Sequence, residues 1–538
     1  MNSSIIFPPA GGRPQRSAVG RAGAAAGRTE RTHGSRTPTV DPLALLVAFS
    51  RARGHGIYLG HGSAGAVHAP PENGALVLGP PRAGKTSGVV VPNVLGADGS
   101  VVAVSTKRDV MEVTAAARRR LGRCLLYDPS GTLAAPPGVE RVGWSPVASA
   151  RDWNAAVLTA EAMVGAARPG GDRGEASHWS ERAAALLAAM LHGAALADAS
   201  VGDLVAAVNR REPERFLGVL ARGGADLALD LLTGILATDG RELSGIWSTV
   251  SGVLGAYRTS EALASSEAPV LDARSLVAER TTLYVAAPGE HQRQAGALVA
   301  GIVRDVRNAA YAMDAERRGQ AVGAERAGPG GGSAPVLLVL DELANIAPLH
   351  DLPSLVAEGA SQGVLTLACL QDLTQARGRW GAAADGFLSL FGAKLVLPGL
   401  GDTRTLEAIS VLAGEREVPA LSRTVDRGRS LIPRRVSRTT STRRERRLPP
   451  DAIAAAPAGT ALLLLGARPA RVEITPYFAY SPWREALAPT GVSGPHRELG
   501  GASDAPRQVP LPTGRSARRA RPGRELDGRG RDRGGLGR

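Results

Sequence analysis

The fold is set by residues 75–86, which read Ala75-Leu-Val-Leu-Gly-Pro-Pro-Arg-Ala-Gly-Lys-Thr86. Four apolar residues predict a buried strand, and the order G-x-x-x-x-G-K-T then predicts a glycine-rich turn that opens a helix near Lys85. Such a turn wraps phosphates with backbone N–H groups, and the dipole of the following helix adds positive potential. We expect Lys85 to meet the β- and γ-phosphates of ATP and the Thr86 hydroxyl to hold Mg²⁺.

The whole turn forms the predicted nucleotide contact. Its residues are Gly79, Pro80, Pro81, Arg82, Ala83, Gly84, Lys85, Thr86 and Ser87. The lysine stands out because the 64 basic residues include only three lysines, Lys85, Lys107 and Lys394. Lysine is a compact point charge whereas arginine is a planar fork, so a lysine kept at this position favours a phosphate contact.

A second chemical element is the apolar strand Val336-Leu-Leu-Val-Leu340, which ends in Asp341-Glu342. In nucleotide-hydrolysing folds the first acid of such a pair reaches the Mg²⁺ site, and the second polarises the attacking water. We predict these roles for Asp341 and Glu342. Gln371 ends a further predicted strand over 364–370, where it either reads the γ-phosphate or the water, or only bonds the backbone.

Strands and helices alternate on both sides of a long helical block. The predicted strands are 75–78, 101–104, 125–127, 282–286, 336–340, 363–370, 394–397, 461–465 and 471–475. Helical patterns alone fill 152–268, which accounts for the 256 residues between Lys85 and Asp341. The alternation predicts a parallel α/β sheet. We therefore expect one α/β domain over 55–151 and 269–485, with an all-helical domain inserted over 152–268.

Composition excludes several classes of protein. Hydrophobic residues make up 43% and charged residues 21% of the 538 residues, as in a soluble globular protein of two or more domains. A wholly disordered chain, a collagen and a coiled coil are excluded, and two cysteines exclude a disulfide scaffold. No membrane span is predicted, because 42–50 is too short and the alanine-rich stretch 183–197 is typical of a buried helix.

The net charge of +14 is unevenly placed along the chain. Net charges of +5, +8 and +6 fall on 1–40, 423–447 and 497–538, so the rest of the chain is about −5. We expect a disordered basic lead over 1–54, an arginine-rich loop at 423–447 and a disordered tail over 486–538, with a flexible Gly-rich linker at 327–333. Either nucleic acid or anionic lipid binds these arginines, or they reflect only a bias toward Arg, Ala and Gly.

Longer motifs resemble those of one family. They are Val89-Val-Val-Pro92, Ser105-Thr-Lys107-Arg-Asp-Val, Tyr127-Asp-Pro129, Trp144-Ser-Pro146, Leu340-Asp-Glu-Leu-Ala-Asn-Ile-Ala-Pro-Leu, Leu352-Pro-Ser-Leu, Gln371-Asp-Leu-Thr-Gln375 and Glu407-Ala-Ile-Ser410. Over about 55–480 the chain resembles the coupling proteins of type IV secretion and conjugation. Members of that family are hexameric, RecA-like P-loop ATPases that feed DNA or protein into the secretion channel.

The resemblance implies roles and partners. It implies that the ATPase residues are Lys85, Thr86, Asp341 and Glu342. It further implies that Gln371 senses the γ-phosphate, that Lys107 supports the site and that 152–268 is a substrate-recognition domain. The resemblance implies that the chain acts on DNA together with a relaxase. It also implies contacts with the components of the secretion channel, and with further copies of the chain in a homo-hexamer.

Two features depart from the family pattern. Members usually carry two N-terminal membrane helices, and none is predicted here. We therefore expect a cytoplasmic protein, peripheral at the inner face of the membrane through a separate membrane partner or its arginine-rich ends. Many members also carry an arginine where this chain has Glu358-Gly-Ala-Ser361. The candidates for a trans-acting arginine finger are then Arg377, Arg379 and Arg404. The alternative for each of them is a solvated surface charge without such a role.

Three functions fit these patterns. The first is an ATP-hydrolysing coupling protein that recruits DNA, with or without bound protein, and drives it into a type IV secretion or conjugation channel. The second is a septal-type translocase of double-stranded DNA, and the third a non-catalytic module that recruits substrate. The continuation Asp341-Glu-Leu-Ala-Asn-Ile346 favours the first over the second, and the intact Gly84-Lys85-Thr86 argues against the third.

Overall fold

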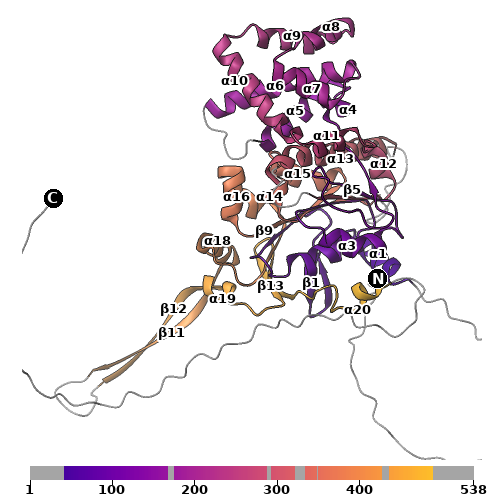
Figure 1. Cartoon of the computed structure of the whole chain (residues 1–538). Helices are drawn as coiled ribbons and strands as arrows, with labels where there is room; N and C mark the ends of the chain where they lie inside the picture. The colour runs from indigo at the N-terminus through magenta and orange to yellow at the C-terminus, as the bar shows by residue number, and fades with distance from the viewer. Residues whose placement is uncertain are drawn as a thin grey trace, which may run out of the picture. The chain divides into compact units, whose positions relative to one another are not determined.

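The computed structural model describes residues 41–167, 175–286, 292–320, 334–347, 349–426 and 435–488 (Figure 1). The segments predicted to be disordered at 1–40 and 489–538, and the linker predicted at 327–333, lie outside these residues. All the described residues belong to one compact unit.

A sheet of twelve strands forms the centre of the described part of the chain, in the order β2-β1-β14-β13-β10-β3-β9-β8-β4-β7-β5-β6. Neighbours from β10 to β6 are parallel, and those from β10 through β13 to β2 are antiparallel. The strands are β1 (Tyr58–Gly62), β2 (Gly65–His68), β3 (Ala75–Leu78), β4 (Val101–Ser105), β5 (Cys124–Tyr127), β6 (Glu140–Arg141), β7 (Thr282–Ala286), β8 (Val336–Leu340), β9 (Val364–Leu370), β10 (Ala393–Val396), β13 (Thr460–Leu465) and β14 (Arg468–Glu473). The middle strands are apolar and buried along their length, as expected for a parallel sheet covered on both faces. The predicted α/β class is confirmed.

Helices cover the sheet and fill the long interval before β7. Those connected directly to strands are α1 (Pro42–Ala52), α2 (Val91–Gly96), α3 (Asp109–Arg118), α13 (Gln292–Gln320), α14 (Leu343–Ile346), α15 (Leu352–Gly359), α16 (Leu373–Trp380), α17 (Phe387–Leu390), α18 (Thr403–Ala413), α19 (Pro450–Ala454) and α20 (Ser481–Leu487). Between β6 and β7 the described chain is helical, comprising α4 (Pro146–Ser149), α5 (Trp153–Ala167), α6 (Glu175–Leu196), α7 (Val201–Arg210), α8 (Glu214–Arg222), α9 (Asp226–Leu236), α10 (Gly240–Val253), α11 (Ser260–Glu267) and α12 (Ala273–Ala278).

The helical block joins the part built on the sheet through α5 and α13, which pack against each other (Figure 1). The Trp144 indole N–H donates to the Asp305 carboxylate of α13 at 2.7 Å, and the Trp144 ring is buried. Apolar side chains from both parts share one continuous core, including Trp144 and Met163. Nowhere in the described ranges is a helix both long enough and apolar enough to cross a bilayer.

The described parts of the arginine-rich segment, 423–426 and 435–446, are strands and not the loop predicted from the charge of 423–447, of which 427–434 lie outside the described residues. Instead β11 (Glu415–Asp426) and β12 (Arg435–Arg446) form a separate antiparallel hairpin. Valine and threonine stand among the arginines here, and such β-branched residues suit an extended pleated backbone. Opposite charges also face each other near the start of the hairpin, where Glu417 lies across from Arg444. The prediction was wrong because it weighed charge and ignored this β-forming composition.

Helix α1 occupies residues that the sequence assigned to a disordered lead. Asp41 caps the helix by accepting a hydrogen bond from the Leu43 N–H at 3.0 Å, and Pro42 stands in its first turn. Leu43 and Val47 are buried, and the helix packs against α2 and α20. No local pattern reveals this helix, since one of its partners lies near the opposite end of the described chain.

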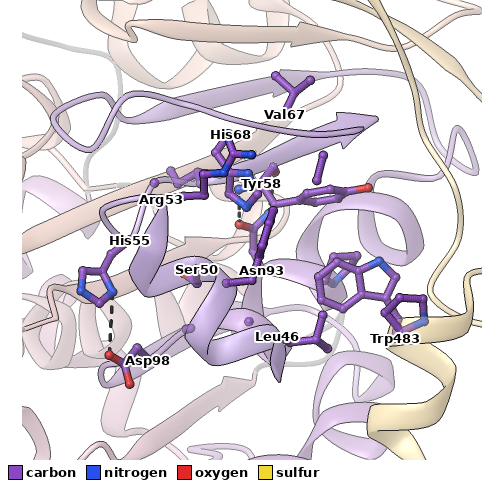
Figure 2. A pocket seen from close by; sticks show the side chains of 18 of the residues that line it. Leu46, Ser50, Arg53, His55, Tyr58, Val67, His68, Asn93, Asp98 and Trp483 are labelled. Atoms are coloured by element: carbon purple, nitrogen blue, oxygen red, sulfur yellow. Dashed lines mark hydrogen bonds and ion pairs between the residues drawn. The ribbon is translucent and has the colours of Figure 1, made fainter. Parts of the chain in front are cut away.

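A cavity of about 1150 Å³ lies between α1, the β1–β2 hairpin and α20 (Figure 2). Tyr58, His68 and Trp483 line it, and the buried Asn93 side chain closes it by donating to the Tyr58 carbonyl at 2.9 Å. Leu337, near the start of β8, also lines it. The cavity therefore lies at the edge where the parallel strands begin, opposite the edge where they end.

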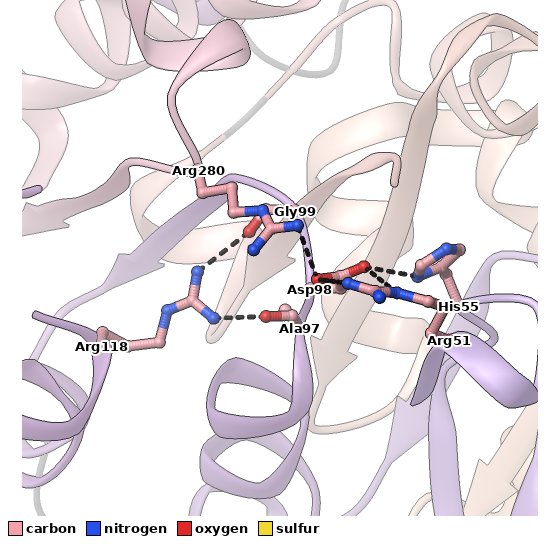
Figure 3. Close-up of polar contacts among 7 residues, drawn as sticks. All are labelled: Arg51, His55, Ala97, Asp98, Gly99, Arg118 and Arg280. Carbon is pink, nitrogen blue, oxygen red and sulfur yellow. Dashed lines mark hydrogen bonds and ion pairs between the residues drawn. The ribbon is translucent and has the colours of Figure 1, made fainter. Parts of the chain in front are cut away.

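The same edge holds a buried carboxylate, Asp98, surrounded by cationic side chains (Figure 3). Arg51 of α1 donates to both carboxylate oxygens at 3.0 Å, while Arg280 approaches to 3.4 Å and His55 to 3.9 Å. Burial alone would raise the pKa of Asp98, but the Arg51 hydrogen bond and the charge of Arg280 hold it below its usual value. This ion cluster ties α1 to the turn before β4.

The neighbouring Arg118 is fully buried, and it holds the same turn from the other side (Figure 3). Its guanidinium donates to the carbonyls of Ala97 and Gly99, the latter at 2.9 Å, and to the Thr282 hydroxyl at 2.8 Å. Two carbonyls and one hydroxyl thus accept the hydrogen bonds of an arginine that has no carboxylate partner in the described chain.

Candidate nucleotide site

The glycine-rich turn follows β3 at the edge where the parallel strands end. The Gly79 N–H donates to the Leu370 carbonyl of β9 at 3.2 Å, which holds the turn against the next strand. A β-carbon at Gly79 would lie 2.9 Å from the Leu397 β-carbon, so only glycine fits there. Gly84 has a φ of +94°, a backbone conformation that side chains disfavour. Close packing at Gly79 and the backbone conformation at Gly84 therefore both favour glycine.

Lys85 folds over the turn that precedes it. Its ammonium donates to the Gly79 carbonyl at 2.5 Å and to the Pro80 carbonyl at 3.0 Å. Burial lowers the pKa of Lys85, whereas the charges of Asp341 and Glu342 act in the opposite direction. A buried ammonium bonded only to carbonyls is well placed to bind an anion entering the turn.

The helix after the turn begins with one wide, π-helical turn over Thr86–Val90 before α2 continues it. The Asn93 side chain donates to the Val89 carbonyl at 2.8 Å and accepts from the Tyr58 N–H at 2.8 Å. The Ser87 carbonyl accepts from the Tyr477 N–H at 2.9 Å. Widened turns of this kind are frequent at functional sites, and here the chain on either side of the helix fixes its position.

Thr86 and Asp341 meet directly, although 255 positions separate them in the chain. The Thr86 hydroxyl donates to the Asp341 carboxylate at 3.1 Å, and the Ser105 hydroxyl lies 3.4 Å from the same oxygen. Asp341 is 5% exposed, and burial raises its pKa to about 6 although the Thr86 hydrogen bond lowers it. Lys85 and Lys107 also lower this pKa by their charge.

This set of donors fits a hard divalent cation. Magnesium is typically held by one or two carboxylates together with a hydroxyl and phosphate oxygens. Thr86 and Asp341 supply such a hydroxyl and carboxylate, and the described chain has no group of three or more His, Cys, Asp or Glu side chains able to hold a metal.

Glu342 follows Asp341 in a strained backbone conformation, with φ 60° and ψ 46°. Its carboxylate accepts two hydrogen bonds at 3.2 Å, from the Thr106 hydroxyl and from the Asn345 amide. The backbone aims the carboxylate, and these two donors hold it. The sequence analysis did not single out Thr106 or Asn345, although both lie inside its quoted motifs.

Gln371 lies at the end of β9, as the sequence predicted for its strand position. Its N–H donates to the Gln375 side-chain oxygen at 3.0 Å, and the Gln375 amide donates to the Asn345 oxygen at 3.5 Å. A chain of hydrogen bonds thus connects the end of β9 with Glu342. The γ-phosphate role of the Gln371 side chain stays a prediction.

The structure therefore brings Lys85, Thr86, Asp341 and Glu342 to one edge of the sheet. Lys107, predicted to support the site, is exposed, and its N–H donates to the Ser105 hydroxyl at 3.2 Å. Arg82 is exposed with a left-handed backbone, φ 65°.

The three arginines considered for a trans-acting role lie on α16 and α18. Arg377 forms an ion pair with Asp385 at 2.8 Å, and Arg404 is exposed at the start of α18. The side chain of Arg379 also has an interaction partner. Nothing here tests a role in a neighbouring subunit, so the arginine finger stays a prediction.

Solved structures and one protein family are similar to this chain. No curated protein sequence matches the chain. The bacterial conjugative coupling protein TrwB, in an unbound form lacking its first 70 residues, shares the fold with a TM-score of 0.59 and 18% identity, over 80% of this chain and 91% of that one. TrwB with the ATP analogue ADPNP matches with a TM-score of 0.55 and 20% identity, over 75% of this chain and 86% of TrwB.

TrwB in complex with ADP and Mg²⁺ also matches with a TM-score of 0.55 and 20% identity, over 78% of this chain and 89% of that one. These likenesses show a RecA-like fold. A family model described as type IV secretory system conjugative DNA transfer matches residues 47–490, which is most of the chain. This chain therefore belongs to the family of type IV secretory system conjugative DNA transfer proteins.

Proposed function

We propose that this protein is an ATP-hydrolysing coupling protein that recruits DNA, with or without bound protein, and drives it into a type IV secretion or conjugation channel. The observation that carries the proposal is the hydrogen bond of 3.1 Å between Thr86 and Asp341. It joins the phosphate-binding turn to the acidic end of β8, the two halves that a nucleotide-hydrolysing site needs. Membership in the conjugative DNA transfer family supplies the transport role.

We infer that the site takes ATP with Mg²⁺, since the relative TrwB forms complexes with the ATP analogue ADPNP and with ADP and Mg²⁺. The N–H groups of the turn and the Lys85 ammonium would bind the phosphates, and Thr86 and Asp341 would hold the ion. When bound, Mg²⁺ neutralises charge on the phosphate oxygens. Lys85 would exchange its two carbonyl partners for phosphate oxygens, a stronger charge-assisted contact.

Glu342 is proposed to orient the attacking water and accept its proton. A carboxylate for this task must point to one place, and the Thr106 and Asn345 donors fix the Glu342 carboxylate at 3.2 Å each. Gln371 is proposed as the sensor of the γ-phosphate, connected to Glu342 through Gln375 and Asn345. The connection would let one end of the site respond to the other.

We further propose that the chain works as a homo-hexamer with a relaxase and the channel components, and that the helices over 152–268 choose the substrate. Removing 152–268 should leave a chain that binds nucleotide and has lost selective recruitment of its substrate. Selective recruitment by the excised protein would show that another surface chooses the substrate.

The decisive experiment measures ATP hydrolysis by the full chain with and without DNA. We expect DNA to stimulate turnover, and Glu342→Gln to bind Mg·ATP while hydrolysing it about 10² to 10⁴ times more slowly. A wild-type chain that binds substrate without hydrolysing ATP would instead be a recruiting module. Strong stimulation by double-stranded DNA alone would favour a septal-type translocase, and wild-type turnover of Glu342→Gln would place the catalytic carboxylate elsewhere.

A further inference from the structure

The hairpin of β11 and β12 has no place in the core. Its two strands of 12 residues form a sheet of their own and pair only with each other in the described chain. Beyond themselves they contact α18, where Arg446 forms an ion pair with Glu407 at 2.9 Å (Figure 1). A two-stranded hairpin without a packed face is marginally stable in water. This hairpin is therefore suited to gain a partner.

The described side chains of the hairpin offer little apolar surface to a partner. Among the described side chains of the hairpin, the large apolar one left exposed is Leu421, which is 77% exposed. Its neighbours Ser422, Thr440 and Ser441 are polar and exposed. Hydroxyls and arginines are side chains that contact phosphate oxygens without reading a sequence.

Charges are balanced at the start of the hairpin and unbalanced farther along. Near the start Glu417 pairs with Arg444 at 3.6 Å, and Arg446 pairs with Glu407. Farther along, Arg443 lies opposite Val418, and Arg438 lies opposite Arg423. Neither Arg438 nor Arg443 therefore has a carboxylate opposite it in the strand register.

The whole segment 423–447 carries net +8, whereas the chain outside it and outside the two basic ends is about −5. Arg438 and Arg443 are exposed, and neither forms an ion pair with any other described residue. A strand rises about 3.4 Å per residue, so 12 residues span about 40 Å, a little more than one turn of duplex DNA. The charge density and the length both match a nucleic-acid backbone.

We propose that the β11–β12 hairpin binds the phosphate backbone of the transported nucleic acid through Arg438 and Arg443. The proposal rests on the proposed function for the presence of DNA, and adds the surface that holds it. Binding is electrostatic and independent of base sequence. The paired charges near α18 fix the hairpin, and the unpaired ones contact the phosphates.

The test compares two variants of the full chain with equal loss of charge. The first carries Arg438→Gln and Arg443→Gln. The matched control carries Arg468→Gln and Arg471→Gln, two exposed arginines of β14 that form no ion pair with another described residue. Fluorescence anisotropy with labelled single- and double-stranded DNA is measured from 50 to 300 mM salt.

Each lost phosphate contact makes the slope of log K against log salt shallower by about 0.9 for duplex DNA and 0.7 for a single strand. We expect the hairpin variant to lose about 1 to 2 from this slope and the control to keep that of the wild type. Equal slopes for the two variants would overturn the hairpin proposal. A changed sedimentation coefficient with an unchanged slope would also overturn it, because the hairpin would then join copies of the chain.

The outcomes also separate this proposal from the proposed function. If the wild-type chain shows no salt-dependent DNA binding, the DNA role fails and the hairpin proposal falls with it. If the wild type binds DNA and the hairpin variant binds equally well, only the hairpin proposal is wrong. ATP turnover without DNA should be the same in both variants, since neither carries a change at the nucleotide site.

Discussion

Asp341 and Asp98 are both buried carboxylates, and they lie at opposite edges of the same sheet. Asp98 is matched by cations of the chain itself, with Arg51 on both oxygens and Arg280 at 3.4 Å, and its pKa is lowered. Asp341 meets the hydroxyls of Thr86 and Ser105, and burial raises its pKa to about 6. The comparison distinguishes a carboxylate that completes the fold from one whose surroundings suit a bound cation.

The cations at the two edges differ in the same way. Lys85 is bonded only to the carbonyls of Gly79 and Pro80, whereas Arg51 is bonded to a carboxylate. We expect Lys85→Ala to lower ATP turnover by about a thousandfold or more, because phosphate charge loses its main cationic contact. The fold should survive, as judged by circular dichroism.

Arg51→Ala is the matched control for that variant. It removes a cation from the other edge, so we expect a lower melting temperature with turnover per folded molecule unchanged. A folded Lys85→Ala protein with substantial DNA-stimulated turnover would remove the nucleotide assignment, and an Arg51→Ala protein without turnover would show that the two edges are coupled.

The two carboxylates themselves give a sharper comparison. Asp341→Asn should lower kcat/KM by at least about a hundredfold and change the free energy of unfolding by less than about 1 kcal/mol, since it removes a buried charge without an ionic partner. Asp98→Asn should leave turnover unchanged and destabilise the fold by about 2 kcal/mol. That is less than for a fully buried pair because the Arg51 side chain is 52% exposed.

Urea unfolding and steady-state kinetics on both variants check this pair of expectations. The assigned roles would be wrong if Asp341→Asn unfolded the protein while Asp98→Asn abolished ATP turnover. Similar losses of stability in both would show that Asp341 also has a structural role.

A smaller effect is expected where a residue only positions the catalytic group. Asn345→Ala removes one of the two donors on the Glu342 carboxylate and should lower kcat about tenfold with little change in KM. Asn209→Ala is the control, because the Asn209 side chain accepts from Ser251 at 2.9 Å within the helical block. An Asn345→Ala variant with the kcat of the control would mean that Thr106 and the backbone suffice to hold Glu342.

The sequence predicted the parallel sheet and the chain positions of the nucleotide site because both follow from local order. A strand, a glycine-rich turn and an acid pair after a second parallel strand must meet at one edge, and Thr86 and Asp341 do. Their catalytic roles stay predictions. The contacts of Thr106 and Asn345 with Glu342 could not be predicted from the sequence. They depend on the left-handed backbone of Glu342, which no local pattern specifies.

The opposite edge was invisible for a different reason. In its ion cluster, Arg51 of α1 and Arg280, which lies just before β7, both contact Asp98. These positions are far apart in the chain, and only the folded sheet brings them together. The β11–β12 hairpin shows a third limit. Its arginines were noticed for their charge, whereas its strands depend on cross-strand pairing that charge does not reveal.

The smallest expected effect is the pH dependence of the Asp98 cluster. Its folded pKa lies below the unfolded value of about 3.9, so its contribution to stability is present above that value and is lost as the pH falls through the folded pKa. The free energy of unfolding of the wild type should therefore exceed that of Asp98→Asn at pH 5, and the difference should shrink toward pH 3. Burial lowers the pKa of the neighbouring His55, so the protonation of His55 moves toward the pH range of this difference. Urea unfolding at pH 5, 4 and 3 measures it. A difference that stayed constant down to pH 3 would mean that Asp98 holds α1 by its shape and hydrogen bonds rather than by its charge, and the contrast with Asp341 would lose its electrostatic basis.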